Sequence, residues 1–318
     1  MATGIDTLLM ERKLIFVTGK GGIGKTLVTC MLAKKAWALG RRVLVVEQSS
    51  VEQIGSLLDF SEIGHEEQWA GSLGVANFTL AGNFKDYISN QLMKSHLLDL
   101  VLSNKIVHSL FTAIPGFGEL MLLGRVFYAM NLSKNIRPDL IIMDSFASGH
   151  FMSLMTTPDA VLQSGLAGPI VQHTLAVKKW LGDSSQCATL YVATPEELVI
   201  SEALEFLPIL AEKSPVKLAG VIMNRCLSEL ENCNDAPSIG SKENSTPSSE
   251  PRNVASEFMR ARRVRQKVAL EKYTQGVDQF GVLKNLPVWH LAEMGAVSEP
   301  LENKIVELYL GVQHDEQK

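Results

Sequence analysis

A lysine and a threonine follow a run of glycines near the amino end, in an arrangement that suits phosphate binding. The sequence GKGGIGKT fits the phosphate-loop pattern Gly19-x4-Gly24-Lys25-Thr26. In such a loop, backbone N–H groups and a helix N-terminus surround phosphate oxygens, and glycine lets the backbone come close. Lys25 is expected along the β- and γ-phosphates, and the Thr26 hydroxyl is expected on Mg²⁺. We predict ATP contacts from the whole stretch, namely Gly19, Lys20, Gly21, Gly22, Ile23, Gly24, Lys25, Thr26 and Leu27.

A carboxylate further along the chain completes a magnesium site. Residues 137–144 read RPDLIIMD, so an apolar strand is predicted to end at Asp144. Downstream of a phosphate loop, a carboxylate at a strand tip suits the water shell of Mg²⁺. We therefore predict Thr26 and Asp144 as the magnesium ligands, and Lys25 and Asp144 among the catalytic residues.

The elements that must hold these residues alternate between strand and helix. The stretch 14–27 begins with an apolar β-forming run, and helical spacing then continues from 26 to 39, with Gly40 as a good helix end. A second apolar run at 42–47 completes a strand–helix–strand unit with a right-handed crossover. Ligands of such folds lie beyond the carboxyl ends of the strands, so residues 47–50 are expected at the site.

Later strands and one long helical stretch define the predicted architecture. Between 81 and 135 the apolar spacing is helical, which predicts a helical subdomain inserted between strands, with faces that suit either plain core or a groove for a partner's helix. We predict an α/β fold, a doubly wound, mostly parallel sheet with helices on both faces, within one ATPase domain over 11–312. Further strands are expected at 74–79, 187–193, 217–225 and 286–290.

The last part of the chain contains segments of different character. Thr194 is predicted to cap a helix that has Pro195 in its first position. Residues 229–252 are polar and rich in proline and serine, which predicts a flexible loop. A basic helix is predicted at 254–273, where a solvated face and a surface for an acidic partner or lipid headgroups both remain open. A closing helix is expected at 299–310.

The composition narrows the classes of function. The chain has 318 residues, 46% of them hydrophobic, and a formal net charge of −4, which gives no reason to expect nucleic acid. Its four cysteines are too scattered for a disulfide framework, which favours a reducing compartment. No apolar run approaches the length of a membrane span, and the amino-terminal residues lack a secretory pattern. We expect a cytoplasmic protein without an integral membrane segment, with peripheral membrane contact left open.

Lys20, directly after the first glycine, is a second lysine that the loop does not need for its fold. On this residue and the surrounding GKGGIGKT, the chain resembles the deviant Walker A class of P-loop ATPases. That class includes the arsenite-pump ATPase, the tail-anchored-protein targeting ATPase, septum-site and partition ATPases, and the nitrogenase iron protein. The resemblance implies that Lys20 reaches the partner's nucleotide across a face-to-face dimer around two ATP molecules, which makes it a catalytic candidate.

Two more segments resemble the arsenite-pump and tail-anchor-targeting branch. The sequence DSFASGH is similar to that branch's DTAPTGH switch, and residues 115–120 look like its PGxxEL segment. A glycine in the switch would let the loop move when the γ-phosphate leaves, and we interpret the histidine as a switch residue and not a base. The matched switch positions after Asp144 are Ser145, Gly149 and His150.

The same resemblance suggests where adenine is bound. Asn224 and Arg225, at the end of the strand predicted at 217–225, match the branch's adenine-contacting asparagine and its neighbour. In the branch, the loop that follows the last short strand, predicted here at 286–290, closes over adenine, and Pro287 of that segment is predicted to contact ATP. These three residues join the predicted ATP-binding set.

Ser49 is the main departure from the family pattern. The first switch of the family reads DxDP, and this chain has Glu47-Gln48-Ser49-Ser50 in its place. Serine is neutral at pH 7 and cannot act as a general base without help, whereas Glu47 corresponds to an acid with a structural role near the metal. We expect ATP and Mg²⁺ to bind while hydrolysis is slow, re-routed or completed by another subunit. No CxxC pair exists, so no metal beyond Mg²⁺ is assigned.

These features favour a dimeric ATP-dependent switch that binds or releases a client or partner protein, as a homodimer or with a related subunit. A membrane protein is one candidate client. A division-site or partition ATPase at a membrane is an alternative, although the carboxyl end lacks a basic amphipathic helix. An arsenite-pump catalytic subunit is disfavoured by the single phosphate loop, and a non-hydrolysing ATP sensor remains open.

Overall fold

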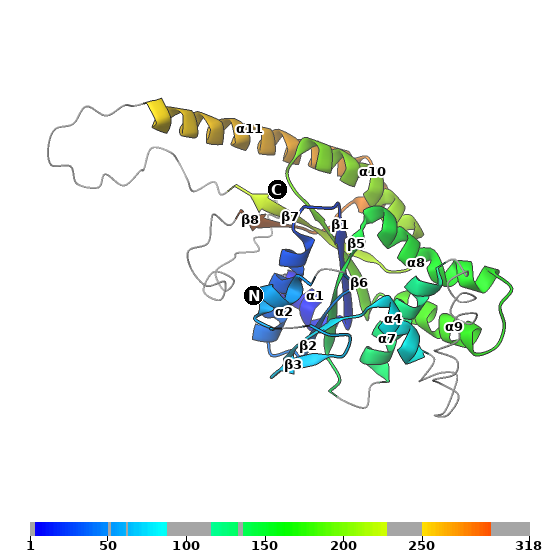
Figure 1. Ribbon diagram of the computed structural model, residues 1–318. Coiled ribbons are helices and arrows are strands. Elements are labelled where there is room, and N and C mark those ends of the chain that lie inside the picture. Colours follow the sequence, from blue (N-terminus) through cyan, green and yellow to red (C-terminus); the bar gives the residue numbers. More distant parts are fainter. Residues whose placement is uncertain are drawn as a thin grey trace.

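The computed structural model describes residues 4–49, 52–61, 63–87, 116–132, 136–227 and 250–293, with side chains from 257 onward in the last range. These residues form one eight-stranded sheet with helices on both faces (Figure 1). The strand order is β3-β4-β2-β5-β1-β6-β7-β8, and all neighbours are parallel except β3 and β4. The predicted α/β fold with a mostly parallel sheet is therefore confirmed. The strands are β1 (Leu14–Gly19), β2 (Val43–Glu47), β3 (Gln68–Ala70), β4 (Leu73–Asn77), β5 (Leu140–Ala147), β6 (Cys187–Ala193), β7 (Leu218–Cys226) and β8 (Val288–Ala292).

The helices separate into two layers. One face of the sheet carries α1 and α2, and the other carries α8 and α10, with α4, α7 and α9 gathered at one side (Figure 1). Long helix α11 runs alongside α10. The helices are α1 (Gly4–Glu11), α2 (Lys25–Ala38), α3 (Ile54–Leu58), α4 (Leu80–Tyr87), α7 (Phe117–Asn131), α8 (Ser148–Gln163), α9 (Pro169–Leu181), α10 (Glu197–Lys213), α11 (Glu250–Asp278) and the 3₁₀ turn Gly281–Leu283.

The central strand β1 is buried along its whole length between β5 and β6. Its apolar run is continuous because helices cover both faces of a parallel sheet. Phe16 on β1 meets Phe151 of α8 edge to face, with ring centroids 5.7 Å apart. Aromatic pairs in this geometry contribute about 0.5–1.5 kcal/mol beyond the area they bury. Strand β1, which leads into the glycine loop, is thus paired with β5 and β6 and packed against α8.

Two predicted boundaries were wrong. The helix expected to begin at Thr194 and Pro195 begins at Glu197, because Thr194 is buried at the end of β6 and its carbonyl accepts the Glu196 N–H at 2.7 Å in a preceding turn. The strand expected to end at Asp144 continues to Ala147, which pairs with Gly19 of β1. The switch segment is therefore strand followed directly by α8, and no loop separates the two.

The predicted subdivisions can be followed only in part. The helices α4 and α7 lie between β4 and β5 in the chain, within the predicted helical insert at 81–135, whereas residues 88–115 and 133–135 lie outside the described residues. Residues 228–249, which include most of the predicted flexible loop at 229–252, and the predicted closing helix at 299–310 also lie outside them. The basic helix expected at 254–273 is present as the longer α11.

Candidate functional site

The phosphate loop lies where β1 ends and α2 begins, at the carboxyl edge of the sheet (Figure 1). Gly19, Gly22 and Gly24 have φ angles of +147°, +82° and +87°, which L side chains rarely adopt. A Cβ atom on Gly19 would lie 2.2 Å from the carbonyl oxygen of Val192, and one on Gly24 would lie 2.7 Å from Nδ2 of Asn224. Glycine is therefore required here by both backbone conformation and close approach.

The two lysines of the loop have different surroundings. Lys25 donates from Nζ to the carbonyl oxygen of Lys20 at 2.9 Å. Burial lowers the pKa of Lys25, and the nearby Asp144 carboxylate opposes that shift. The ammonium of Lys20 turns the other way and pairs with Glu202 of α10 at 2.6 Å. Within this chain, Lys25 therefore bonds back to the backbone of its own loop, whereas Lys20 lies on the outer side of the loop.

Thr26 and Asp144 are brought together as the sequence predicts. The Thr26 hydroxyl donates to Asp144 Oδ2 at 2.6 Å. Burial raises the pKa of Asp144, whereas the hydrogen bond from Thr26, the charge of Lys25 and the Thr29 hydroxyl lower it. Within the described residues, Asp144 Oδ1 is buried and has no hydrogen-bond partner. A buried carboxylate oxygen that lacks a partner fits the oxygen ligation that Mg²⁺ prefers, directly or through water.

Glu47 lies beside Asp144, since the two residues pair in the register of β2 and β5. Burial raises the pKa of Glu47 to about 7, Asp144 adds to the rise, and the N–H of Gln53 opposes it. Two carboxyl groups on adjacent strand ends make this corner of the site acidic. A cation in the corner would relieve their repulsion.

Ser49 is fixed by a residue that the sequence argument missed. Asn77, at the end of β4, accepts the Ser49 N–H on Oδ1 at 3.2 Å and donates from Nδ2 to the Ser49 carbonyl at 2.8 Å. This two-way amide contact aligns the first switch with the strand next to β2. The only sequence signal for Asn77 was its place at the carboxyl end of a predicted strand, where site residues gather.

Asn224 and Arg225 brace the phosphate loop from the end of β7. Asn224 donates from Nδ2 to the carbonyl of Ile23 at 2.8 Å, and Arg225 reaches the carbonyl of Gly22 at 3.4 Å. Arg225 has a φ of +59°, and its own carbonyl accepts from Gln266 of α11 at 2.9 Å. The amide predicted to contact adenine is thus hydrogen-bonded to the loop in this structure.

Pro287 is not brought to the site. It precedes β8, and its carbonyl accepts the N–H of Val221 near the start of β7 at 2.9 Å. Because β7 and β8 run parallel to β1, this position is at the amino edge of the sheet, opposite the phosphate loop. The expectation that Pro287 contacts ATP was therefore wrong; the predicted loop follows β8, beyond residue 293, outside the described residues.

The second switch touches the helical insert. His150, in the first turn of α8, stacks on Phe146 with ring centroids 3.8 Å apart, and its Nε2 lies 3.3 Å from Glu119 of α7. Ser145 is buried in β5, and Gly149 has open space where a Cβ would be. A hollow of about 420 Å³ lies between the two switches. Its lining residues are Gln48, Ser49, Thr79, Leu80, Gly118, Glu119, Phe146 and His150.

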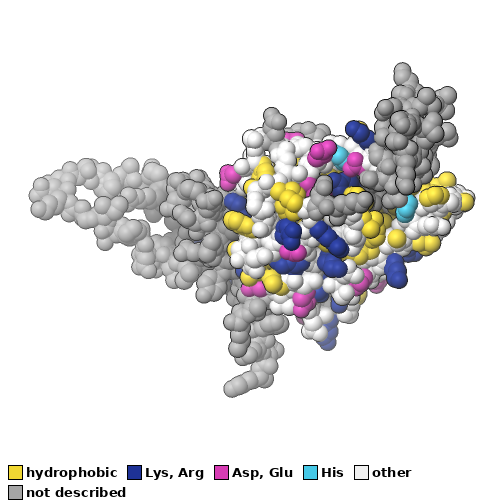
Figure 2. All heavy atoms as spheres, turned by 90° about the horizontal axis from the view of Figure 1, so that it is seen from below, with side chains coloured by type: hydrophobic (Ala, Val, Ile, Leu, Met, Phe, Trp, Pro, Cys, Tyr) yellow, Lys and Arg dark blue, Asp and Glu magenta, His cyan; other side chains and the backbone are white. Residues whose placement is uncertain are grey.

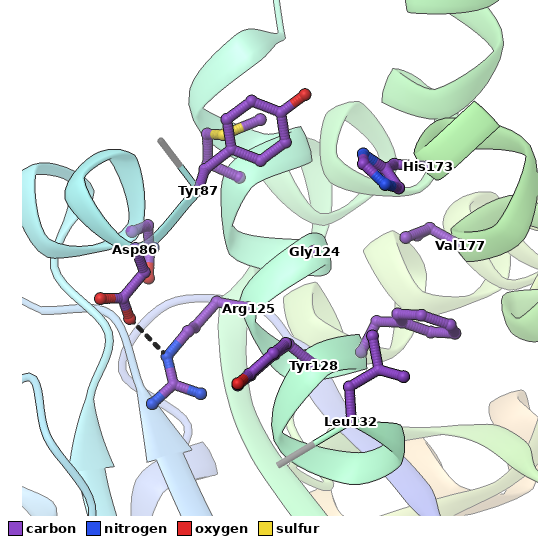
Figure 3. Close-up of a pocket in the computed structure, with 11 residues that line it drawn as sticks. Asp86, Tyr87, Gly124, Arg125, Tyr128, Leu132, His173 and Val177 are labelled. Atoms are coloured by element: carbon purple, nitrogen blue, oxygen red, sulfur yellow. Dashed lines mark ion pairs between the residues drawn. The ribbon is translucent and has the colours of Figure 1, made fainter. Parts of the chain in front are cut away.

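A smaller cavity of about 130 Å³ lies inside the helical region, between α4, α7 and α9 (Figure 3). Arg125 points toward Asp86, and the two form an ion pair with Nε and Oδ2 2.8 Å apart. Tyr128 and His173 border the cavity from α7 and α9. Seen from below, hydrophobic side chains gather on the side of the molecule where α7 and α9 lie (Figure 2). The helical region thus combines a partly buried ion pair with exposed hydrophobic side chains.

Two possible features are not found in the part of the chain that the structure describes. It contains no group of three or more histidine, cysteine, aspartate or glutamate side chains arranged to hold a metal ion. None of its helices is both long and apolar enough to cross a bilayer. Cys226 is buried in β7, where burial raises the pKa of its thiol to about 11, and Cys233 lies outside the described residues.

Comparison with known proteins identifies the relatives of this chain. Residues 12–167 match the family described as anion-transporting ATPases. ATPase BagA of Mycobacterium tuberculosis is 28% identical over 70% of this chain and 68% of its own length. ATPase ARSA1 of Chlamydomonas reinhardtii is 27% identical over 67% of this chain and 30% of its own length. ATPase get3 of Neurospora crassa is 27% identical over 52% of this chain and 49% of its own.

Proposed function

Since this chain belongs to the ArsA-like ATPase family, we propose that it is a dimeric switch driven by ATP. In this proposal ATP and Mg²⁺ bring two subunits together, slow hydrolysis lets them part, and the helical region binds or releases a client or partner protein. The observation that carries the proposal is the phosphate loop with positive-φ glycines beside the Thr26–Asp144 pair.

The nucleotide would be held mainly by the loop. Its backbone N–H groups and the N-terminus of α2 favour the negative charge of the phosphates. Lys25, now bonded to the carbonyl of Lys20, would exchange that contact for phosphate oxygens, which are stronger acceptors for a cation. Thr26 and Asp144 would hold Mg²⁺, which supplies charge neutralisation at the β- and γ-phosphates when bound.

The dimeric part of the proposal rests on Lys20. Its side chain lies on the outer side of the loop, where it is about 40% exposed. An ammonium at that position can serve a second subunit's nucleotide without leaving its own loop. The pair with Glu202 would then be the resting arrangement of the single subunit.

Slow turnover follows from the first switch. Hydrolysis needs a group that orients or deprotonates the attacking water. Ser49 offers no charge, and its backbone is held by Asn77. Glu47 is buried and bonds to the N–H of Gln53. Turnover would therefore be limited in this subunit, and a catalytically complete partner is one way to overcome the limit.

Coupling to a client would run through the contact between switch and insert. His150 belongs to α8, directly after the strand that carries Asp144, and it meets Glu119 of the helical region. A movement of the second switch on loss of the γ-phosphate would therefore shift α7. We infer that 81–135 is the client-binding subdomain of a domain that spans 11–312.

Calorimetry and single-turnover hydrolysis test the proposal together. ATP with magnesium should give a binding isotherm that Lys25→Ala abolishes, and ATP should increase the dimer fraction. Ser49→Asp should raise the single-turnover rate by about 10²-fold or more, because a positioned base contributes about 10²–10⁴-fold. Ser49→Asn is the matched control, because it adds similar bulk without the charge.

Each outcome has a distinct meaning. No heat with ATP and magnesium from folded protein would refute the proposal. Binding and dimerisation without turnover, in both the wild type and Ser49→Asp, would identify a non-hydrolysing ATP sensor. A wild-type rate already equal to that of Ser49→Asp would show that the serine does not limit hydrolysis.

A further inference from the structure

Helices α10 and α11 lie side by side (Figure 1). A groove of about 590 Å³ runs between the start of α10 and the face of α11. Its apolar side chains are unusually open for a folded domain, and Leu198 is 78% exposed. Burial of such side chains is the main favourable contribution to protein association. The apolar lining residues are Pro195, Leu198, Phe258, Ala261, Val264, Val268 and Ala269.

The rim of the groove is basic. Arg262, Arg265 and Lys272 project along α11, and Arg225 comes from the end of β7. Glu196 and Glu197 line the α10 side, where Lys272 lies 3.9 Å from Glu197. The side of the groove formed by α11 therefore favours an occupant that is apolar on one face and acidic beside it.

The chain leaves its last described strand at this groove. The N–H of Glu293 bonds to the carbonyl of Cys226 at 2.8 Å, directly after Arg225 on β7. Its carboxylate pairs with Arg262 of the groove rim, also at 2.8 Å. The chain beyond Glu293 therefore starts beside the groove, and the carboxylate of Glu293 itself is already paired with the groove rim.

The sequence beyond Glu293 has the chemistry that the groove requires. Between 301 and 312 it reads LENKIVELYLGV, preceded by Ser298-Glu299-Pro300 and containing Gly311, which are helix start and stop signals. Glu302 and Glu307 supply acidic charge. Five apolar residues, Leu301, Ile305, Leu308, Tyr309 and Val312, repeat with helical spacing and form one stripe, whereas Val306 and Leu310 fall on the other side of the helix.

The dimensions also agree. A helix over 301–312 would be about 18 Å long, and the stretch of α11 from Phe258 to Lys272 spans about 21 Å, at 1.5 Å per residue. The intervening residues 294–300 can reach about 23 Å when extended, at roughly 3.3 Å each. The linker is therefore long enough for the segment to enter the groove from either end.

We propose that residues 301–312 dock into the α10–α11 groove as an amphipathic helix, with Leu198 and Val268 covered by its apolar stripe and its acids on the basic rim. The competing internal occupant, residues 228–249, is less suited, because its few large apolar side chains do not form a helical stripe. The docked segment would lie next to Arg225, which also contacts the phosphate loop. The proposal is independent of whether the chain hydrolyses ATP.

Photo-cross-linking in the full-length chain tests this proposal without assuming a register. Leu198 is replaced by p-benzoylphenylalanine, and the same replacement at the exposed Leu175 of α9 is the control. After illumination, mass spectrometry should find residue 198 joined to a peptide from 301–312 in a species of monomeric mass. The residue at 175 should not capture that peptide.

A second pair of variants separates docking from chance proximity. Ile305→Asp places a charge in the apolar stripe and should lower the cross-linking yield by about tenfold or more, as expected for the loss of a buried aliphatic side chain. Asn303→Asp adds the same charge on the opposite face and should leave the yield nearly unchanged. Capture of 228–249, a cross-linked dimer, or no cross-link at all would overturn the proposal, as would equal effects of the two variants.

Discussion

The ion pair between Lys20 and Glu202 predicts how readily the early lysine becomes available to a second subunit. The two charged groups are 2.6 Å apart, and their side chains are 40% and 41% exposed. If Lys20 contacts a partner's nucleotide, this pair must break first. Glu202→Gln keeps the shape of the side chain and removes its charge, so it should favour the ATP-bound dimer.

The size of the effect follows from the exposure of the pair. Solvent-exposed ion pairs contribute about 0.2–1 kcal/mol each. A symmetric dimer breaks two of them, so its dissociation constant should fall by about 2- to 30-fold in Glu202→Gln, given that 1.4 kcal/mol corresponds to tenfold. With a different partner subunit only one pair breaks, and the change should be at most about fivefold.

Sedimentation equilibrium with magnesium and ATP, at low ionic strength where charge effects are strongest, measures the dissociation constant. Glu205→Gln is the matched control, because Glu205 is exposed one turn further along α10 and is not the partner of Lys20. The effect of Glu202→Gln should also disappear in a Lys20→Met background. The reasoning is refuted if Glu205→Gln tightens the dimer equally, or if Glu202→Gln weakens it.

Two further predictions concern the stability of the fold. Gly24→Ala should lower the free energy of unfolding, measured by thermal melts, by about 1–3 kcal/mol, because the φ of Gly24 is positive and the new Cβ would meet Asn224 Nδ2 at 2.7 Å. Gly149→Ala is the control and should not destabilise the protein in the same melts, because Gly149 lies in the first turn of α8 with open space around it. Burial raises the pKa of Asp86, but its contacts with His65 and Arg125 outweigh burial and set the pKa below its usual value. A lowered folded-state pKa stabilises the protein above the usual value of about 4 and loses that effect as the pH falls. Asp86→Asn should therefore cost about 1–3 kcal/mol at pH 7, and the difference from wild type in urea denaturation should shrink at acidic pH; a constant difference down to acid would contradict this account.

The parts of the site that follow local rules could be predicted from the sequence. The glycine loop and the carboxylate at Asp144 can each be recognised in a short stretch of sequence. The loop is a strand followed by spaced glycines, lysine and threonine, and the carboxylate is an acid at the end of an apolar strand, and both patterns are typical of phosphate and magnesium sites. The structure brings Thr26 and Asp144 within hydrogen-bonding distance, although they are far apart in the chain. Position at the carboxyl edge of a parallel sheet was enough to relate them.

The parts that depend on tertiary pairing could not be predicted in the same way. The strand β5 runs past Asp144 because Ala147 pairs with Gly19 and the Thr18 hydroxyl bonds to the carbonyl of Phe146. The sequence of residues 145–150 alone gives no sign that Ala147 pairs with Gly19. The short antiparallel strand β3 was missed for a related reason, since three residues are too few to show a period. The role of Asn77 likewise exists only through its contact with Ser49.

The helix α10 joins the phosphate loop to the groove on α11. Glu202 holds Lys20, and the preceding residue, Ser201, accepts a hydrogen bond from Lys272 at 2.8 Å. The two helices approach closely, since a Cβ on Gly276 would lie 2.5 Å from Leu204. Packed helices cannot deform smoothly, so they tend to shift as units. Release of Lys20 to a partner would remove a restraint from the helix that forms one wall of the groove, and this would give nucleotide binding a direct physical route to the groove.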